Sequence, residues 1–322
     1  MKVLFLYTEL SLYIEKCFEK LVENNYKLLV FRYPVNKEAP FKFNEDSRIN
    51  YITYTPQSPG LLMNAIEHFS PELVFCSGWK NLFYLKVAKK YKEIKVPVVL
   101  CFDNNWNGSC RQFLATALLK RFFAKRFTFA WVPGSNQREF AIRLGFNEEC
   151  IQTGFYTADI VFFQKIYFKR SKLTQQNFPK RFIYIGRYVS LKGIEDLWIA
   201  FKLFSEKFPD WELWCFGTGN LSPVAHPKIK HFGFKQPAEL YSLLLDGGVF
   251  VLPSRFEPWG VIVHEMAAAG FAPAGEFGFL PAVQEERDVG VLFRLGDAQL
   301  LHAGIADDLA QRVVRQIGRA HV

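Results

Sequence analysis

The sequence predicts an α/β chain made of two doubly wound, Rossmann-like domains. Short apolar runs alternate with amphipathic stretches through the first half, and the same alternation starts again at Phe182. This alternation is typical of parallel strands covered by helices on both faces of a sheet. Between the two halves, residues 161–180 lose the apolar alternation and gain Lys, Gln and Asn. We therefore expect a first domain at 1–160, a connection at 161–180, a second domain at 181–315, and a ligand cleft between the domains.

The first domain is expected to begin with a buried strand. Buried strands are predicted where apolar runs are short and continuous, at Val3–Tyr7, Lys27–Phe31, Leu73–Cys76, Val96–Cys101 and Phe127–Val132. Helices are predicted in the amphipathic stretches between them, at Ser11–Glu23, Leu61–Phe69, Leu82–Tyr91 and Cys110–Ala124. In such sheets ligands bind beyond the carboxyl ends of the strands, so the loops there are the places to look for chemistry.

The second domain repeats this alternation, with glycine turns between the elements. Strands are expected at Phe182–Ile185, Trp211–Phe216, Ile229–Phe234 and in the apolar run that ends at Pro253. Helices are expected at Ile194–Lys207, Pro237–Leu245 and Val261–Ala269, and a proline suits the first position of the middle one.

Bulk composition narrows the class of protein. The chain has 322 residues, which is enough for two domains, and half of them are hydrophobic. Met1–Tyr7 is too short for a signal peptide, and no apolar run has the length of a membrane span. Six scattered cysteines without a C-x-x-C pair indicate free thiols in a reducing cytoplasm. The net charge of +9 predicts an anionic partner, and because no nucleic-acid motif occurs we expect no nucleic acid.

The stretch from Phe250 to Gly270 combines an apolar run, a polar turn and a helix with two carboxylates. Glu257 lies in the turn, and Glu265 lies on the helix. A strand, a turn and a helix N-terminus present backbone N–H groups to an anion. The two carboxylates are then placed to hold hydroxyl groups on either side of that anion. Two surface acids of an ordinary βα unit are the alternative.

A second anion site is predicted at Gly186–Gly193. Arg187 and Lys192 lie in this glycine turn between a strand and a helix. Arginine binds phosphate oxygens with its planar fork, whereas lysine supplies a point charge. A charged helix start without a ligand is the alternative.

These two motifs together resemble the retaining family 4 glycosyltransferases, which have the GT-B fold. P-S-x-x-E-P-x-G followed by E-M-A-A-A-G resembles the E-x7-E signature of that family, and G-R-x-x-x-x-K-G resembles its diphosphate element. The resemblance implies that Glu257 lies by the donor sugar, Glu265 binds the ribose, and Arg187 and Lys192 neutralise the donor diphosphate. It further implies a nucleotide-binding set completed by Gly217, Phe234, Trp259, Gly260 and Val261.

Asp103 is the candidate acid on the acceptor side. It follows a predicted strand, in a loop rich in Asn that also contains Trp106. The family commonly has a His-Asp pair here, but Phe102 takes the place of the His. The loop after the first strand, Thr8–Ser11, also lacks the glycines that relatives carry. A solvated turn is the alternative for the Asp103 loop.

Metal ligands are not expected. No two aspartates lie two residues apart, and Ala268 occupies the position of the second His in a zinc-protease H-E-x-x-H. Basic clusters occur at residues 86–95 and in Leu118–Phe127, where cations mix with aromatic residues and leucines. Two interpretations stay open for these clusters: contact with an anionic membrane surface, or a solvated helix face that covers the sheet.

The expected activity is that of a metal-independent, hexosyltransferase-type enzyme. It would move a sugar from a nucleoside-diphosphate sugar to a glycan or lipid-linked acceptor in polysaccharide biosynthesis, with retention of configuration and no further cofactor. We expect a cytoplasmic protein that is peripheral at the inner face of the membrane if the basic clusters bind lipid. A nucleotide-sugar epimerase or phosphorylase on the same fold, and a non-catalytic sugar-binding relative, are the alternatives.

The last seven residues of the sequence are expected to be non-native. Residues 316–322 are encoded by CAG-ATC-GGA-AGA-GCA-CAC-GTC, which from its second base is a common sequencing adapter. We therefore expect a non-native tail at 316–322, without tertiary contacts, after a second domain that is incomplete at its end. Helices that cross back to the first domain usually end GT-B enzymes, and 298–315 leaves room for about one helix of ordinary length.

Overall fold

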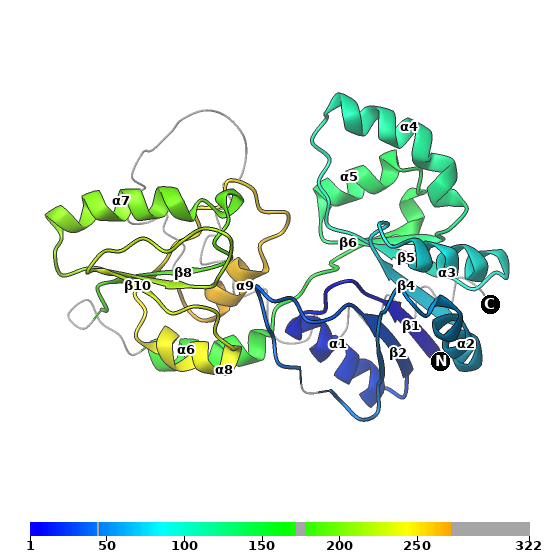
Figure 1. The fold of residues 1–322 in the computed structure, drawn as a ribbon, viewed down its shortest axis with the longest axis horizontal. Coiled ribbons are helices and arrows are strands. Elements are labelled where there is room, and N and C mark those ends of the chain that lie inside the picture. Colours follow the sequence, from blue (N-terminus) through cyan, green and yellow to red (C-terminus); the bar gives the residue numbers. More distant parts are fainter. Residues whose placement is uncertain (44, 172–177, 272–322) are drawn as a thin grey trace. The chain divides into compact units, whose positions relative to one another are not determined.

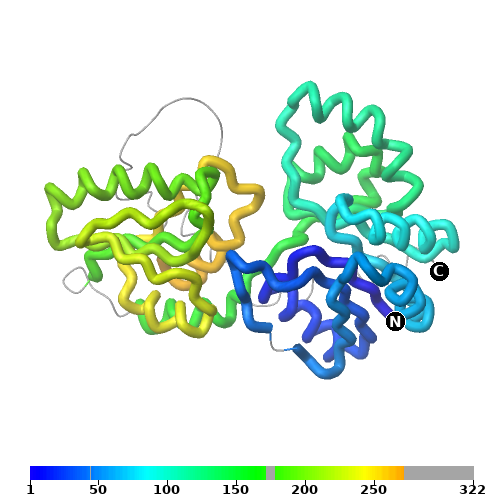
Figure 2. The backbone as a smooth tube through the Cα atoms, in the orientation of Figure 1, coloured from blue at the N-terminus to red at the C-terminus, as the bar shows by residue number. Residues whose placement is uncertain are grey.

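The computed structural model describes residues 1–43, 45–171 and 178–271 (Figure 1). These residues form two compact units. Of the described residues, unit 1 comprises Met1–Val35 and Phe43–Thr157, and unit 2 comprises Asn36–Lys42 and those from Ala158 to Phe271. Figure 2 follows the alternation of strand and helix along the backbone of each unit. The predicted end of the second domain at 315, the helix expected in 298–315 and the tail expected at 316–322 lie outside the described residues.

Unit 1 is built on a seven-stranded parallel sheet with the order β3-β2-β1-β4-β5-β6-β7. Because β1 lies inside the sheet, with Val3 beside Leu28 on one side and Leu73 on the other, the chain winds outward in both directions. The strands are β1 (Lys2–Leu6), β2 (Lys27–Arg32), β3 (Asn50–Thr53), β4 (Leu73–Ser77), β5 (Val98–Cys101), β6 (Phe129–Val132) and β7 (Ile151–Thr153). The helices are α1 (Leu12–Glu23), α2 (Pro59–Phe69), α3 (Leu82–Glu93), α4 (Cys110–Ala124) and α5 (Ser135–Arg143), and a 3₁₀ turn covers Glu148–Cys150.

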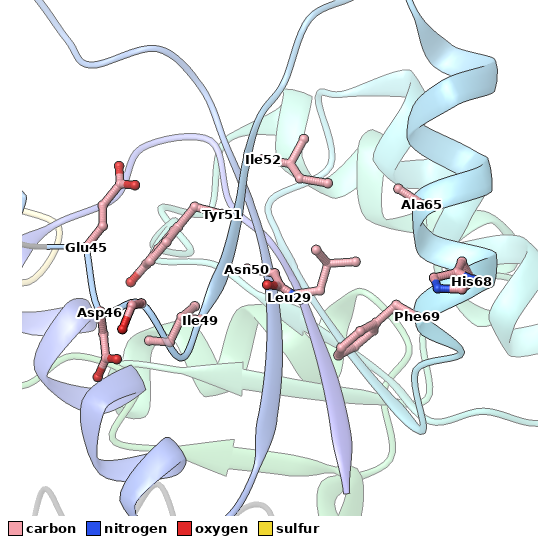
Figure 3. Close-up of a pocket in the computed structure, with 11 residues that line it drawn as sticks. Leu29, Glu45, Asp46, Ile49, Asn50, Tyr51, Ile52, Ala65, His68 and Phe69 are labelled. Carbon is pink, nitrogen blue, oxygen red and sulfur yellow. The ribbon is translucent and has the colours of Figure 1, made fainter.

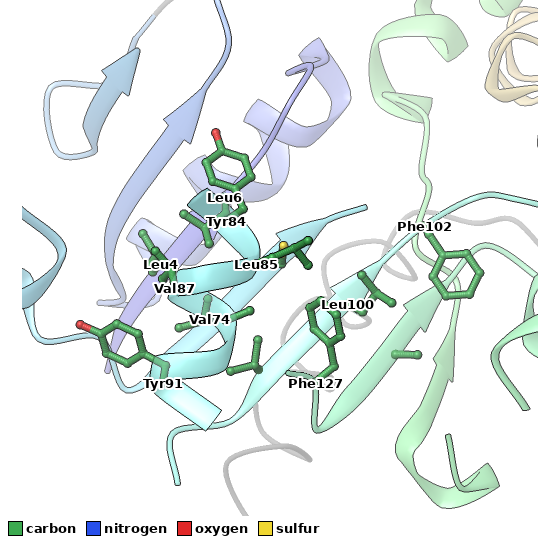
Figure 4. Packing of buried hydrophobic residues seen from close by; sticks show 14 of the residues in the cluster. Leu4, Leu6, Val74, Tyr84, Leu85, Val87, Tyr91, Leu100, Phe102 and Phe127 are labelled. Carbon is green, nitrogen blue, oxygen red and sulfur yellow. The ribbon is translucent and has the colours of Figure 1, made fainter. Parts of the chain in front are cut away.

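Both faces of this sheet are covered, as the continuous apolar runs predict. Alternate residues of a strand point to opposite faces. Leu4 and Leu6 therefore pack with α2, α3 and α5, in the cluster that Figure 4 shows, whereas Val3 and Phe5 pack with α1 on the other face. This double covering buries the central strands on both sides, so the carboxyl ends of these strands and the connecting loops are the places where a ligand can reach them.

Two strands of unit 1 were not predicted. β3 and β7 are the edge strands, with four and three residues, and most of their side chains are only partly buried. An edge strand packs on fewer neighbours, so its sequence need not contain an apolar run. Ladder pairing with β2 and β6 forms these strands instead.

Unit 2 is built on a four-stranded parallel sheet with the order β10-β9-β8-β11. Its strands are β8 (Arg181–Ile185), β9 (Glu212–Phe216), β10 (Ile229–His231) and β11 (Val249–Phe250). Its helices are α6 (Ile160–Arg170), α7 (Ile194–Lys207), α8 (Pro237–Leu245) and α9 (Val261–Ala268), and a 3₁₀ turn covers Ser190–Lys192. One face packs against α7 and the other against α6, α8 and α9.

Several predicted boundaries in this unit differ from the structure. β10, expected at Ile229–Phe234, ends at His231. α6 lies inside the segment that was expected to be a connection, because Phe163 and Ile166 are buried against the sheet of unit 2. β11 ends at Phe250, although one more bond follows, from Val251 N to Ile183 O, before Pro253 interrupts the pattern with no N–H to donate. Asn36–Lys42, expected in the first domain, belongs to unit 2. Among the described helices, none combines the length and the apolar character needed to cross a membrane.

Candidate functional site

The two predicted anion motifs meet at the carboxyl end of the unit 2 sheet. The turn after β8 leads through Ser190–Lys192 to Gly193, which has a φ of +64° and starts α7. A Cβ atom on Gly193 would collide with the carbonyl oxygen of Pro253, in the loop after β11. Glycine is therefore required here for its backbone conformation and for the close approach of the two loops.

Lys192 and Glu257 form an ion pair across this contact. The Nζ of Lys192 donates to Oε2 of Glu257 at 2.5 Å, and the hydroxyl of Ser254 donates to the same oxygen at 3.1 Å. The Lys192 and Glu257 side chains are only 19% and 15% exposed. Because water screens such a pair less than a surface pair, the interaction fixes the position of the ammonium group. Two of the predicted site residues are thus brought together.

Arg255 holds the loop of Glu257 on the turn of Lys192, and the sequence analysis missed it. Its Nη1 donates to the carbonyl and hydroxyl oxygens of Ser190 at 3.1 and 2.7 Å. Its Nε and Nη2 donate to Oδ2 of Asp196, on α7, at 3.0 and 2.6 Å. Its backbone N–H donates to Leu191 O at 3.0 Å. Only its place between Ser254 and Glu257 in the motif could have indicated this role.

Arg187 lies in the same turn but has a different partner. Its guanidinium is exposed and lies 3.8 Å from the carboxylate of Glu38. Its carbonyl oxygen accepts a hydrogen bond of 2.8 Å from the hydroxyl of buried Tyr184. Within the described residues, no hydrogen bond or ion pair joins Arg187 to the Lys192–Glu257 pair. The turn therefore places one cation inside the contact and leaves the other at the surface.

Gly217 lies in the loop after β9, and Phe234 lies in the loop after β10. A Cβ on Gly217, whose φ is +132°, would collide with the carbonyl oxygen of Gly186, so this turn packs directly on the turn that carries Arg187. The ring of Phe234 meets the ring of Phe41 edge to face, with centroids 5.0 Å apart. The predicted nucleotide-binding turn and the predicted diphosphate turn are thus adjacent.

The segment Asn36–Lys42 also contacts these loops. Thr218 donates through its hydroxyl to Glu38 O at 2.8 Å. Gln236 donates to Pro40 O at 2.8 Å and accepts from the backbone N–H of Lys42 at 3.2 Å. No sequence signal links this segment to residues almost two hundred positions away.

The helix α9 carries the second carboxylate of the E-x7-E stretch. Gly260, with a φ of +72°, caps its N-terminus before Val261, and the Trp259 ring stacks on that of His264 at 5.8 Å. Burial, and to a smaller degree the negative charge of Asp159, raises the pKa of Glu265 to about 8. The side chain of Glu265 makes no hydrogen bond or ion pair with any described residue. It is therefore largely protonated at neutral pH and open to a hydroxyl partner.

Asp103 lies in unit 1, where it lines a separate pocket of about 240 Å³. The pocket is formed at the carboxyl ends of β1, β4 and β5, and Glu9, Trp79 and Lys80 also line it. The hydroxyl of Tyr156 donates to Oδ2 of Asp103 at 2.9 Å. Burial and this carboxylate raise the pKa of Tyr156 well above its ordinary value, so its hydroxyl stays a donor. Carboxylates, a cation and aromatic rings are suited to a polyhydroxyl ligand.

A larger hollow of about 640 Å³ lies elsewhere in unit 1, beside the edge strand β3 (Figure 3). Tyr51 of β3 and Asp46 lie on one side of it, and His68 and Phe69 of α2 lie on the other. None of the predicted site residues lines it, so it is not the site that the motifs define.

The comparisons with known proteins agree with the motifs in unit 2. The family model described as glycosyl transferases group 1 matches residues 166–317. An uncharacterized glycosyltransferase of Methanocaldococcus jannaschii is 32% identical over 117 residues, which is 33% of this chain. That match spans 29% of the relative's own length. The matches support a group 1 glycosyltransferase domain.

Solved structures show the fold. The Anabaena protein HepE in complex with UDP matches with a TM-score of 0.60 at 15% identity, over 84% of this chain and 79% of that chain. Sucrose-phosphate synthase from Thermosynechococcus elongatus matches with a TM-score of 0.59 at 15% identity, over 84% of this chain and 80% of that chain. UDP-N-acetylglucosamine 2-epimerase from Rickettsia bellii matches with a TM-score of 0.51 at 13% identity, over 85% and 78%. The two parallel sheets are thus the Rossmann-like domains of a GT-B fold.

Proposed function

We propose that this chain transfers a sugar from a nucleoside-diphosphate sugar to a glycan or lipid-linked acceptor, as a retaining, hexosyltransferase-type enzyme of family 4. The observation that carries the proposal is the Lys192–Glu257 pair, which joins the diphosphate element to the E-x7-E stretch. The group 1 family match over the same residues supports it. HepE and its UDP complex support a nucleotide sugar as the donor class.

In this proposal Lys192 and Arg187 stabilise the leaving diphosphate. Negative charge on the leaving group grows as the bond to the sugar breaks, and fixed cations stabilise that charge more than they stabilise the intact donor. Before the donor binds, Glu257 holds the Lys192 ammonium group in place. A donor phosphate then shares or takes over this ammonium, and Glu257 turns toward the sugar hydroxyls.

The nucleoside would bind along Gly217, Phe234 and α9. Ribose hydroxyls that donate to Glu265 favour its ionised form, because a hydrogen bond to a carboxylate stabilises the charge. The pKa of about 8 in the free protein therefore falls on binding, and a proton is released. Trp259, Gly260 and Val261 supply the ring and backbone around the start of α9.

The acceptor would bind in the pocket of unit 1 that contains Asp103. Tyr156 fixes the carboxylate through the 2.9 Å hydrogen bond, and the remaining oxygen can accept from an acceptor hydroxyl. In a retaining reaction on one face of the sugar, the leaving phosphate itself can take the acceptor proton. The protein then needs cations and positioning groups, with no nucleophile of its own.

The test is a panel of nucleoside-diphosphate sugars with the purified chain. Binding is measured by calorimetry, and release of nucleoside diphosphate is followed with and without oligosaccharide or lipid-linked acceptors. Acceptor-dependent release, together with a glycosylated product of unchanged anomeric configuration by NMR, is the expected result. Interconversion of the donor sugar without an acceptor would instead show an epimerase. Release that depends on inorganic phosphate would show a phosphorylase, and binding without release would show a sugar-binding protein.

A further inference from the structure

Helix α4 of unit 1 has an unusual outer surface. Of its fifteen residues, Thr116 and Phe123 are buried, whereas Phe113, Leu114 and Leu118 are 53%, 64% and 70% exposed. Leu114 and Leu118 are four residues apart, so both side chains lie on the same face of the helix. A helix in a soluble domain ordinarily turns such a stripe toward the core. Here α4 packs on α5 (Figures 1 and 2), and Leu114 and Leu118 stay exposed.

The charge around this helix has one sign. No Asp or Glu occurs between Asp103 and Glu139, although six Lys and Arg residues do. Arg126 stacks on Phe122, and Arg138 pairs with Glu148. The other four cations are exposed and form no ion pair with any described residue: Arg111, Lys120, Arg121 and Lys125.

The chain provides a comparison in α7. Ile199 and Leu203 are also an exposed aliphatic pair four residues apart, and they are 62% and 61% exposed. α7, however, carries Glu195, Asp196 and Glu206 together with its lysines. Single exposed aliphatic residues are normal on protein surfaces. The difference in α4 is the combination of exposed leucines with cations that no acid balances.

We propose that the outer face of α4 (Leu114, Leu118, Arg121 and Lys125) binds an anionic lipid bilayer. The leucine side chains enter the interface between headgroups and acyl chains, and the cations bind lipid phosphates. A nucleic acid would use the cations but leave the leucines exposed to water. A bilayer uses both, and α4 would lie in its surface. The inference does not depend on the transfer reaction.

The binding test uses the full chain and sedimentation with vesicles. Vesicles of phosphatidylcholine with about one third phosphatidylglycerol should bind the chain, and vesicles of phosphatidylcholine alone should not. The pair Arg121→Gln with Lys125→Gln should lower the partition coefficient about 30-fold. The pair Leu114→Ser with Leu118→Ser should lower it at least about tenfold. The matched pair Ile199→Ser with Leu203→Ser on α7 should leave it unchanged.

A second measurement locates the contact. Cys110, at the start of α4, is exposed, whereas the other five cysteines are partly or fully buried. With Cys17→Ser and Cys150→Ser, an environment-sensitive fluorophore on Cys110 should shift to the blue when the anionic vesicles are added. Three outcomes would overturn the proposal. The α7 pair of substitutions could weaken vesicle binding as much as the α4 pairs do, the fluorophore could show no blue shift, or the chain could bind duplex DNA but not vesicles. Circular dichroism and binding of nucleoside diphosphates without vesicles should not differ among these variants, which separates this result from failure of the transfer activity.

Discussion

The ammonium nitrogen of Lys192 lies 2.5 Å from a carboxylate oxygen of Glu257, although 65 positions separate the two residues in the chain. Neither motif predicts the contact by itself. It arises because the loops after β8 and β11 belong to adjacent strands of one parallel sheet. The carboxyl ends of those strands lie at the same edge, so the cation of one loop meets the acid of the other. The roles of these loops in donor binding, transfer and stability can be tested by substitution.

Lys192→Ala should lower kcat about 100-fold while the dissociation constant of the donor rises by less than about tenfold. The reason is that the cation acts most strongly on charge that develops in the transition state. Steady-state kinetics and calorimetry measure the two effects. Lys207→Ala, at the exposed end of α7, is the control and should match the wild type. If kcat at saturating donor hardly moved, the pair would be structural.

Arg255→Ala should lower kcat about tenfold, because the turn that carries Lys192 loses the side-chain bonds of Arg255 to Ser190 and Asp196 and is held less firmly on the Glu257 loop. The unfolding free energy should change by less than about 1 kcal/mol, as for other exposed ion pairs. Asp196→Asn should show a smaller effect of the same kind, since Arg255 keeps its bonds to Ser190.

The control for Arg255 is Lys180→Ala, which removes the exposed ion pair with Asp210 elsewhere in unit 2. It should change neither kcat nor KM. Arg255 would have no positioning role if its variant lost stability but turned over at the wild-type rate once folded.

Glu265→Ala should weaken donor binding by roughly 1–3 kcal/mol, because the ribose hydroxyls lose their charged acceptor. The pH dependence should have a definite sign. The pKa of Glu265 is about 8 in the free protein, and ribose binding favours the ionised form, so binding releases a proton below pH 8. Affinity should therefore rise with pH between pH 6.5 and pH 8 and level off above, where the group is already ionised. Calorimetry in buffers of different ionisation enthalpy measures the released proton, and Glu265→Gln should abolish its release.

The same group affects folding with the opposite dependence on pH. Its pKa is raised above the ordinary 4.5, so the folded state binds the proton more tightly than the unfolded chain. Its contribution to stability is fully present below pH 4.5 and is lost as the pH rises to about 8. Comparison of the wild type with Glu265→Gln by denaturant unfolding across this range isolates that contribution.

Gly193→Ala should destabilise the fold by roughly 1–3 kcal/mol more than Gly233→Ala. Both glycines have a φ between +60° and +70°, so both substitutions share the penalty of that backbone conformation. Only at Gly193 would the new Cβ collide with a carbonyl oxygen, that of Pro253, whereas Gly233 has open space around it. Unfolding by urea measures the difference. Equal losses would mean that the two loops are not packed as tightly as the structure shows.

Much of the fold could be predicted from local sequence patterns. The bounds of α7 and α8 match their predictions because a glycine or proline starts each helix and the apolar spacing continues to the last turn. β3 and β7 were not predicted because an edge strand is formed by hydrogen bonds to the neighbouring strand and needs no apolar run. α6 was not predicted because it lies in a segment with many polar residues, and its burial depends on packing against the sheet of unit 2.

The sequence by itself determined which residues of unit 2 are the candidates for binding and catalysis. Spacing between glycines, cations and carboxylates is a local property, and it identified Arg187, Lys192, Glu257 and Glu265. Only the tertiary structure decided which partners and which surroundings these groups have. In the folded chain Lys192 pairs with Glu257, whereas Arg187 lies apart from them beside Glu38. Arg255 connects the loop of Glu257 to the turn of Lys192 through Ser190. The tertiary structure also raises the pKa of Glu265, because a pKa depends on burial and on the charges nearby, and both are set by residues that are distant in the chain.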